Sequence, residues 1–136
     1  MTGAVVYALE PDLAADAFQG VLVASGLAPR RPADDLERLG RMLAASDLIV
    51  TARLDGRLVG VARTLTDFAF CAYLSDLAVT RDLQSQGIGR RLIAETRAAA
   101  GPEVSLLLTA APGIEGYYDA IGMTRVPQAF RFDRKR

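Results

Sequence analysis

Two glycines separated by one residue, Gly87 and Gly89, mark the segment of this sequence that is best suited to chemistry. They follow an apolar run and a polar loop, and the residues after them have the pattern of a helix. Glycines let a backbone approach a ligand closely, and the first turn of a helix points unpaired N–H groups outward at the positive end of its dipole. We therefore predict that the amides of Gln86 through Arg90 form a nest for a phosphate-like anion, with added charge from Arg90 and Arg91.

Other Gly-rich phosphate loops fit this segment less well. A dinucleotide-binding loop has its glycines directly after the strand and a third glycine three residues after Gly89, where this chain has Leu92. A Walker loop continues with Gly-Lys-Ser/Thr, whereas two arginines follow Gly89. A purely structural interpretation stays open at this point, in which the two glycines only shape a loop and a helix start.

The sequence offers few side chains for covalent catalysis. It has no histidine, which excludes Ser-His-Asp and Cys-His chemistry, and a single cysteine, Cys71, so that neither an internal disulfide nor a metal site is expected. Lys135 is the only lysine, which argues against a lysine nucleophile. Cys71 lies in a predicted strand with no histidine or lysine nearby, and packing is its more typical role there.

The composition predicts one globular domain that spans residues 1–136. The chain is 51% hydrophobic and 24% charged, and its 16 basic side chains balance its 16 acidic ones. Balanced charge argues against a general nucleic-acid binder, and no apolar run approaches the roughly 18 residues of a membrane-spanning helix. We therefore expect a cytoplasmic protein without a nucleic-acid or membrane partner.

Hydrophobic periodicity and turn residues predict an α/β (or α+β) mixed sheet with helices on both faces, in the order β-α-α-β-β-β-α-β-α-β. Asp55-Gly56 between two β-rich runs predicts a hairpin, because both turn positions favour positive φ. The predicted strands are Ala4–Leu9, Leu48–Leu54, Arg57–Leu65, Phe70–Val79, Val104–Thr109 and Thr124–Phe132. The predicted helices run from Pro11 to Gly26, over Asp34–Ala45, over Gly87–Ala100 and over Ile114–Ile121.

Two motifs resemble the GNAT superfamily of N-acetyltransferases. Gln84-x-x-Gly87-x-Gly89, after a strand that ends Leu77-Ala78-Val79, is similar to the acetyl-CoA pyrophosphate loop of that family. The stretch from Tyr117 to Met123 is similar to the Phe-Tyr-x-x-x-Gly-Phe stretch on the family's last helix. The order of elements also fits over the whole chain, with a mostly antiparallel central sheet. Three positions depart from the family pattern, which often has Asn, Pro and Phe where this chain has Ala111, Arg81 and Met123.

The resemblance implies acetyl-CoA as co-substrate and a role for each matching residue. The loop Gln84–Arg90 would bind the pyrophosphate, and Leu77 and Val79 would pair with the pantetheine arm at a point where the strand splays from its neighbour. The Leu77 N–H would polarise the thioester carbonyl, and Tyr118 would protonate the departing thiolate. The implied cofactor-binding residues are Leu77, Ala78, Val79, Gln84, Ser85, Gln86, Gly87, Ile88, Gly89, Arg90 and Tyr118.

Acyl transfer to an amine also needs a group that removes the amine proton. Asp76 lies next to the proposed oxyanion donor in an otherwise apolar run, so we predict that it is a base or an anchor for the amine. The alternative is that a neighbouring backbone group or an arginine satisfies it. Tyr117 and Tyr118 face about 100° apart on a helix, and we expect Tyr117 to be the core residue of the pair.

These observations predict an N-acetyltransferase that moves acetyl directly from acetyl-CoA to a primary amine of a small molecule, peptide or protein. Two alternatives stay open: a catalytically idle module that binds or senses acyl-CoA, and an interaction domain without a cofactor. Arg30 and Arg31 could bind an acidic acceptor, although two arginines between prolines are more typical of a solvated connector. A two-fold homodimer is also expected.

Overall fold

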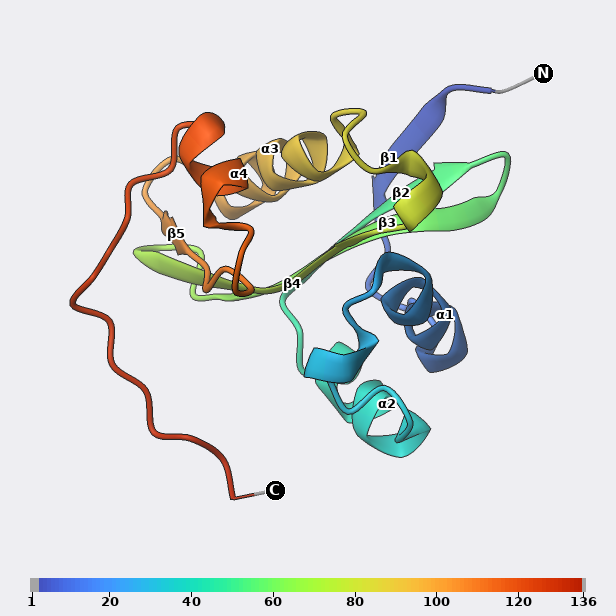
Figure 1. Cartoon of the computed structure of the whole chain (residues 1–136), viewed down its shortest axis with the longest axis horizontal. Helices are drawn as coiled ribbons and strands as arrows, with labels where there is room; N and C mark the ends of the chain where they lie inside the picture. Colours follow the sequence, from blue (N-terminus) through green and yellow to red (C-terminus); the bar gives the residue numbers. More distant parts are fainter. Residues whose placement is uncertain (1–2, 136) are drawn as a thin grey trace.

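The computed structural model describes residues 3–135, in which a five-stranded sheet carries helices on both faces (Figure 1). Strands β1 to β5 follow one another across the sheet in chain order, and every neighbouring pair is antiparallel except β4 and β5, which are parallel. The predicted fold class is confirmed. The strands are β1 (Val5–Leu9), β2 (Leu48–Leu54), β3 (Arg57–Thr66), β4 (Cys71–Val79) and β5 (Ser105–Leu107). The helices are α1 (Ala15–Ser25), α2 (Leu36–Ala44), α3 (Ile88–Ala100) and α4 (Glu115–Ala120), with 3₁₀ turns η1 (Ala28–Arg30) and η2 (Arg81–Leu83).

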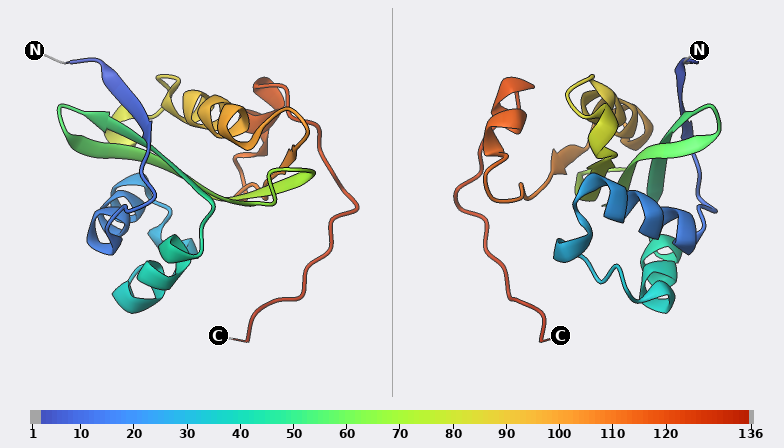
Figure 2. Two further views of the ribbon diagram at one scale, coloured as in Figure 1. Left: turned by 180° about the vertical axis from the view of Figure 1, so that it is seen from behind. Right: turned by 45° about the vertical axis from the view of Figure 1, so that its right-hand side comes forward.

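The sheet separates two hydrophobic layers. Helices α1 and α2 pack on one face, where Phe18 and Leu39 are fully buried, and α3 and α4 pack on the other, where Leu92 is fully buried (Figure 2). Strand β4 contributes to both layers, because successive side chains of a strand point to opposite faces. Ala78 lies on the α1/α2 side, whereas Leu77 lies on the side of α3 and α4.

Turn residues set most of the element boundaries. Asp55 and Gly56 have φ values of 52° and 82°, which confirms the predicted hairpin, and Gly26 ends α1 with φ 87°. The start of α1 was expected at Pro11, but the helix begins at Ala15. Residues 10–13 instead form a turn, which the Leu13 N–H closes on the Glu10 carbonyl at 3.2 Å.

The predicted last strand, Thr124–Phe132, is wrong: no strand follows α4 in the part of the chain that the structure describes. The segment runs away from β5 and the body of the protein (Figure 1). Pro127 cannot donate a ladder hydrogen bond and forms a turn with Gln128. Phe130 and Phe132 are 97% and 103% exposed, so the apolar alternation that predicted a strand has no surface to cover here.

Gly60 has no side chain, and this allows α3 to approach the sheet closely. A Cβ at Gly60 of β3 would lie 3.0 Å from a methyl carbon of Leu92 and 3.3 Å from the Ala78 carbonyl oxygen. Glycine at this position therefore lets the first turns of α3 sit directly on β3 and β4. The start of α3 is thereby held beside the end of β4. Within residues 3–135, no helix is both long and apolar enough to span a bilayer.

Candidate functional site

Strands β4 and β5 separate soon after they begin to pair. Their parallel ladder holds three residue pairs, of which the last is Tyr73 with Leu107, and β4 then continues to Val79 without β5 beside it. On the other side, β4 stays paired with β3 as far as Gly60 and Val79. The sheet therefore has an open strand edge between β4 and the segment that follows β5.

The pairing register shows which backbone groups point toward this opening. Thr80 donates its N–H to the Val59 carbonyl at 2.9 Å, so it forms a hydrogen-bonded pair with β3. In an antiparallel ladder such pairs alternate with non-hydrogen-bonded pairs, whose N–H and C=O groups point away from the partner strand. Leu77 and Val79 are in non-hydrogen-bonded pairs with β3, so their N–H groups face the opening. Ala78 is a hydrogen-bonded residue paired with Val61, and its side chain lies in the α1/α2 layer, so it presents neither group to the opening.

The loop between β4 and α3 presents a series of unpaired amides. The Gln84 N–H bonds to the Arg81 carbonyl, and the next backbone donor with an acceptor is Arg91, which bonds to the Gly87 carbonyl at 3.0 Å. Among the described residues, no acceptor contacts the N–H groups of Ser85 through Arg90. Ser85 and Gly87 have φ values of 67° and 87°, and left-handed residues in such a loop turn successive amides toward one side.

Gln84 fastens this loop to the strand before it. Its side-chain amide donates to the Val79 carbonyl at 2.9 Å and to the Ser25 carbonyl at 3.2 Å. The side chain of Gln84 is therefore used within the protein, and its role is to fix the loop between the end of β4 and the end of α1.

The two arginines at the start of α3 differ in their surroundings. Arg91 lies over the ring of Tyr7, 4.6 Å from its centroid, and forms an ion pair with Glu95 at 2.9 Å, so it points away from the loop. For Arg90, the described residues include no ion-pair partner. Arg90 therefore stays the candidate for added charge at the loop, and Arg91 instead packs across the helix toward β1.

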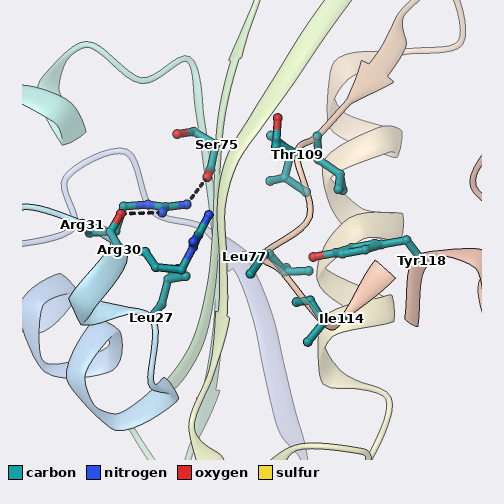
Figure 3. A pocket seen from close by; sticks show the side chains of 11 residues that line it. Leu27, Arg30, Arg31, Ser75, Leu77, Thr109, Ile114 and Tyr118 are labelled. Carbon is teal, nitrogen blue, oxygen red and sulfur yellow. Dashed lines mark hydrogen bonds between the residues drawn. The ribbon is translucent and has the colours of Figure 1, made fainter. Parts of the chain in front are cut away.

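Tyr118 of α4 reaches into the opening from the opposite side (Figure 3). Its ring packs on the α3 layer, and its hydroxyl points toward Leu77 in the view of the small cavity that both residues line. Burial raises the pKa of Tyr118 above its usual value of 10.0, and the neighbouring Tyr117 raises it further. The hydroxyl is therefore protonated at neutral pH and can donate a proton.

The expectation that Tyr117 is the core residue of the tyrosine pair is wrong. Tyr117 is 40% exposed, whereas Tyr118 packs against the buried layer. The two rings meet edge to face with centroids 5.1 Å apart. A Cβ at Gly89 would lie 2.7 Å from the Tyr117 hydroxyl oxygen, so Tyr117 lies against the first turn of α3. Short α4 sits at the rim of the sheet, where only one of its two tyrosines reaches the core.

Asp76 is held in a buried ion-pair cluster. Its side chain is fully buried, and its two carboxylate oxygens accept hydrogen bonds from Arg31 of the loop after η1 and Arg63 of β3. Arg31 also donates to the Ser75 carbonyl at 2.7 Å, and Arg63 to the Ser75 hydroxyl at 2.9 Å. The carboxylate is thus held between two guanidinium groups and does not reach the surface of the protein. These ion pairs are the partners that the alternative interpretation expected, and a role of Asp76 as a base or amine anchor stays a prediction.

Sequence reasoning missed Arg63 as the partner of Asp76. The signal was present, because Arg63 is a charged residue within a predicted strand that is otherwise mostly apolar, as Asp76 is. Two opposite charges in two such strands are expected to pair if the strands are neighbours. The structure makes them neighbours, with Arg63 directly opposite Asp76 in the β3–β4 register.

Comparison with known proteins agrees with this geometry. Residues 31–134 match the family model of the acetyltransferase (GNAT) domain. This chain belongs to the GNAT acetyltransferase family. As a member of this family it is an acetyltransferase, and the resemblance found in its two sequence motifs is confirmed. No curated protein matches the chain.

Solved structures share the GNAT fold at low sequence identity. A putative acetyltransferase from Deinococcus radiodurans is 22% identical, with a TM-score of 0.76, 99% of this chain covered and 94% of the other. A probable acetyltransferase from meticillin-resistant Staphylococcus aureus is 18% identical, with a TM-score of 0.81 and coverage of 98% and 100%. An aminoglycoside N-acetyltransferase in complex with CoA is 15% identical, with a TM-score of 0.74 and coverage of 100% and 97%.

Proposed function

We propose that this GNAT protein transfers acetyl from acetyl-CoA directly to the primary amine of a small molecule or peptide. One observation carries the proposal: the N–H groups of Ser85 through Arg90 lack acceptors in the described chain and lie beside the open edge of β4. Unpaired amides at a helix start bind anions, and a free strand edge binds an extended ligand. These residues fit a ligand with phosphates at one end and amide groups along its arm, as acetyl-CoA has.

Acetyl-CoA supplies the activated acetyl thioester, and residues of this chain bind and orient it. The amides from Ser85 to Arg90, including those of Gln86, Gly87, Ile88 and Gly89, bind the pyrophosphate, and the Arg90 guanidinium adds positive charge. The outward-pointing backbone groups of Leu77 and Val79 hold the extended arm. The Leu77 N–H donates to the acyl oxygen and so stabilises the charge that develops there during attack.

Two proton transfers complete the reaction. An alkylamine with a pKa near ~10.4 reaches the site mostly protonated. Because Asp76 is fully buried between Arg31 and Arg63, the amine loses its proton to water. Tyr118 donates a proton to the departing sulfur. A thiol has a pKa near ~8.5 and an unperturbed phenol one near ~10, and burial raises the pKa of Tyr118 further, so this transfer is uphill by at least about 2 kcal/mol. That cost is small against the barrier of an acyl transfer.

A charge placed in the loop tests the phosphate site. Gly87→Asp puts a carboxylate among the unpaired amides, where two like charges about 4 Å apart repel by about 4 kcal/mol near a protein surface. We expect calorimetry to show coenzyme A affinity reduced by roughly 10²-fold or more. Gly87→Asn is the matched control, since it has the same size and accepts the same positive φ without a charge. Equal affinity for both variants would contradict the phosphate site.

A screen for acetyl transfer tests the activity itself. Thiol release from acetyl-CoA is followed with amino acids, polyamines, aminoglycosides and peptide N-termini as acceptors. We expect release that depends on at least one class of amine. Tight coenzyme A binding without release in any reaction would instead support the idle acyl-CoA-binding module.

A further inference from the structure

The cavity at the open edge of β4 is positively charged. It has a volume of about 50 Å³ and lies between η1, β4 and the segment from β5 to α4 (Figure 3). Its lining mixes polar and apolar groups and includes Leu77 and Tyr118, the residues placed at the acyl group. The charged side chains in this lining are Arg30 and Arg31, and no acidic residue lines it.

Arg31 is committed to the protein. Its guanidinium bonds to Asp76, to the Ser75 carbonyl at 2.7 Å and to the Arg30 carbonyl at 2.9 Å. Asp76 also pairs with Arg63, so one carboxylate balances two guanidinium groups and the cluster keeps a net positive charge. Arg31 itself lines the cavity.

Arg30, unlike Arg31, has no side-chain partner among the described residues. It is exposed, and the described residues offer its guanidinium neither a hydrogen bond nor an ion pair. Figure 3 shows its side chain extending from η1 toward β4, on the side of the cavity opposite Tyr118. Its backbone at the end of η1 is held in place, because the adjacent Arg31 is anchored to Asp76. Arg30 is thus an exposed cation without a partner in the described chain, and it lines the cavity on the side opposite the proposed acid Tyr118.

We propose that Arg30 binds a carboxylate of the acceptor, so that the substrates are small primary amines of the amino-acid type. This inference rests on the proposed acetyl transfer and names its substrate class. An arginine and a carboxylate form two parallel charge-assisted hydrogen bonds, which fix orientation as well as affinity. Acceptors with several ammonium groups are disfavoured, because the cavity offers the additional cations no acidic partner and Arg30 repels them.

Matched pairs of acceptors test the proposal. Each amino acid is compared with its carboxamide, for example phenylalanine with phenylalaninamide, in the thiol-release assay. The amine of the carboxamide is less basic, so a larger fraction of it is unprotonated at neutral pH, and without recognition the carboxamide should react faster. A preference for the amino acid therefore indicates that the enzyme recognises the carboxylate. We expect wild type to prefer the acid by roughly 10-fold or more in kcat/KM. A panel in which every amide is acetylated as fast as its acid would overturn the proposal.

Variants of Arg30 test whether this side chain causes the preference for the amino acid over its carboxamide. Arg30→Gln should raise KM for the acid by roughly 10- to 10²-fold, leave the rate with the amide within about 2-fold, and leave KM for acetyl-CoA unchanged. Arg30→Lys should restore part of the preference, because it keeps the charge without the planar fork. Arg97→Gln is the control, since it removes an equal charge from an exposed position on α3. An acid-to-amide ratio that Arg30→Gln leaves intact would rule Arg30 out.

A binding measurement separates this inference from the proposed function. In the presence of coenzyme A, N-acetylphenylalanine should raise the melting temperature of wild type but not of Arg30→Gln, and N-acetylphenylalaninamide should raise neither. Carboxylate-dependent binding without turnover would contradict the transfer reaction and support the anion site. Turnover without any carboxylate dependence would support the transfer reaction and contradict the anion site.

Discussion

Removing one hydroxyl group, from Tyr118 or from Tyr117, tests acid catalysis. Tyr118→Phe removes the hydroxyl that faces Leu77 and leaves the packed ring in place. We expect the maximal rate of acetyl transfer to fall by roughly 10²-fold while coenzyme A affinity stays within about 2-fold, because general acid catalysis contributes about 10²–10⁴. Steady-state kinetics and calorimetry measure the two effects separately. Tyr117→Phe is the control and should keep most of the rate.

The pH profile extends the same test. Because burial raises the pKa of Tyr118 above 10.0, the hydroxyl keeps its proton throughout the neutral range, and the rate with an alkylamine should rise with pH as the amine loses its proton. A wild-type rate that falls between pH 7 and pH 9 would contradict a proton donor with a raised pKa. An unchanged maximal rate in Tyr118→Phe would remove Tyr118 from the mechanism.

Individual residues also show where sequence reasoning reached its limit. The unpaired amides around Gly87 were predictable because a turn and a helix start are local properties of the sequence. Tyr118 was selected as the candidate acid only through the resemblance of its motif to that of the family. The ion-pair partners of Asp76 were not predictable for a non-local reason, because they come from a loop and a strand that are distant in sequence. An apolar run with one acid in it indicates that the acid is partnered or functional, but the spatial neighbours decide which.

At the scale of elements, the loop between β3 and β4 is held by one carboxylate. One oxygen of Asp67 accepts the N–H groups of Ala69, Phe70 and Cys71 at 2.9, 2.8 and 3.2 Å. These bonds lower the pKa of Asp67 from 3.8 to about 2. A carboxyl group with a lowered folded-state pKa stabilises the fold above its unfolded pKa, and this contribution is lost as the pH falls from about 4 to about 2.

Asp67→Asn should therefore be less stable than wild type at pH 6, and the difference should shrink as the pH approaches 2. Urea unfolding at both pH values measures the change in midpoint. Asp12→Asn, an exposed substitution with the same change in charge, serves as the control. A stability difference that stays constant across this range would show that the loop does not depend on the charge of Asp67.

The ends of elements that have their own turn or cap residues were predictable from the sequence. The ends of strands that depend on pairing with a neighbouring strand were less predictable. The β2–β3 hairpin and the end of α1 follow from Asp55-Gly56 and Gly26, whose left-handed conformations are encoded locally. The sequence also predicted β5 over Val104–Thr109, but the strand spans only Ser105–Leu107. Pairing with β4 limits its length, and the point of separation is a tertiary property.

At the scale of the whole molecule, the order of the elements and the two-layer arrangement were predictable because hydrophobic periodicity carries both. The last predicted strand was not, since Thr124–Phe132 has the alternation of a strand but lies beside none. The expected homodimer stays a prediction.

The early separation of β4 from β5 has a consequence for how amide hydrogens exchange with solvent deuterium. In the free protein, the backbone N–H groups of Leu77 and Val79 should exchange rapidly, while that of Ala78, bonded to β3, should exchange slowly. Coenzyme A would act as the strand that the sheet lacks at this point. At a concentration a hundredfold above its Kd, it should slow exchange at Leu77 and Val79 by about 10²-fold. If both amides are already protected before any ligand is added, the gap in the sheet is closed in solution.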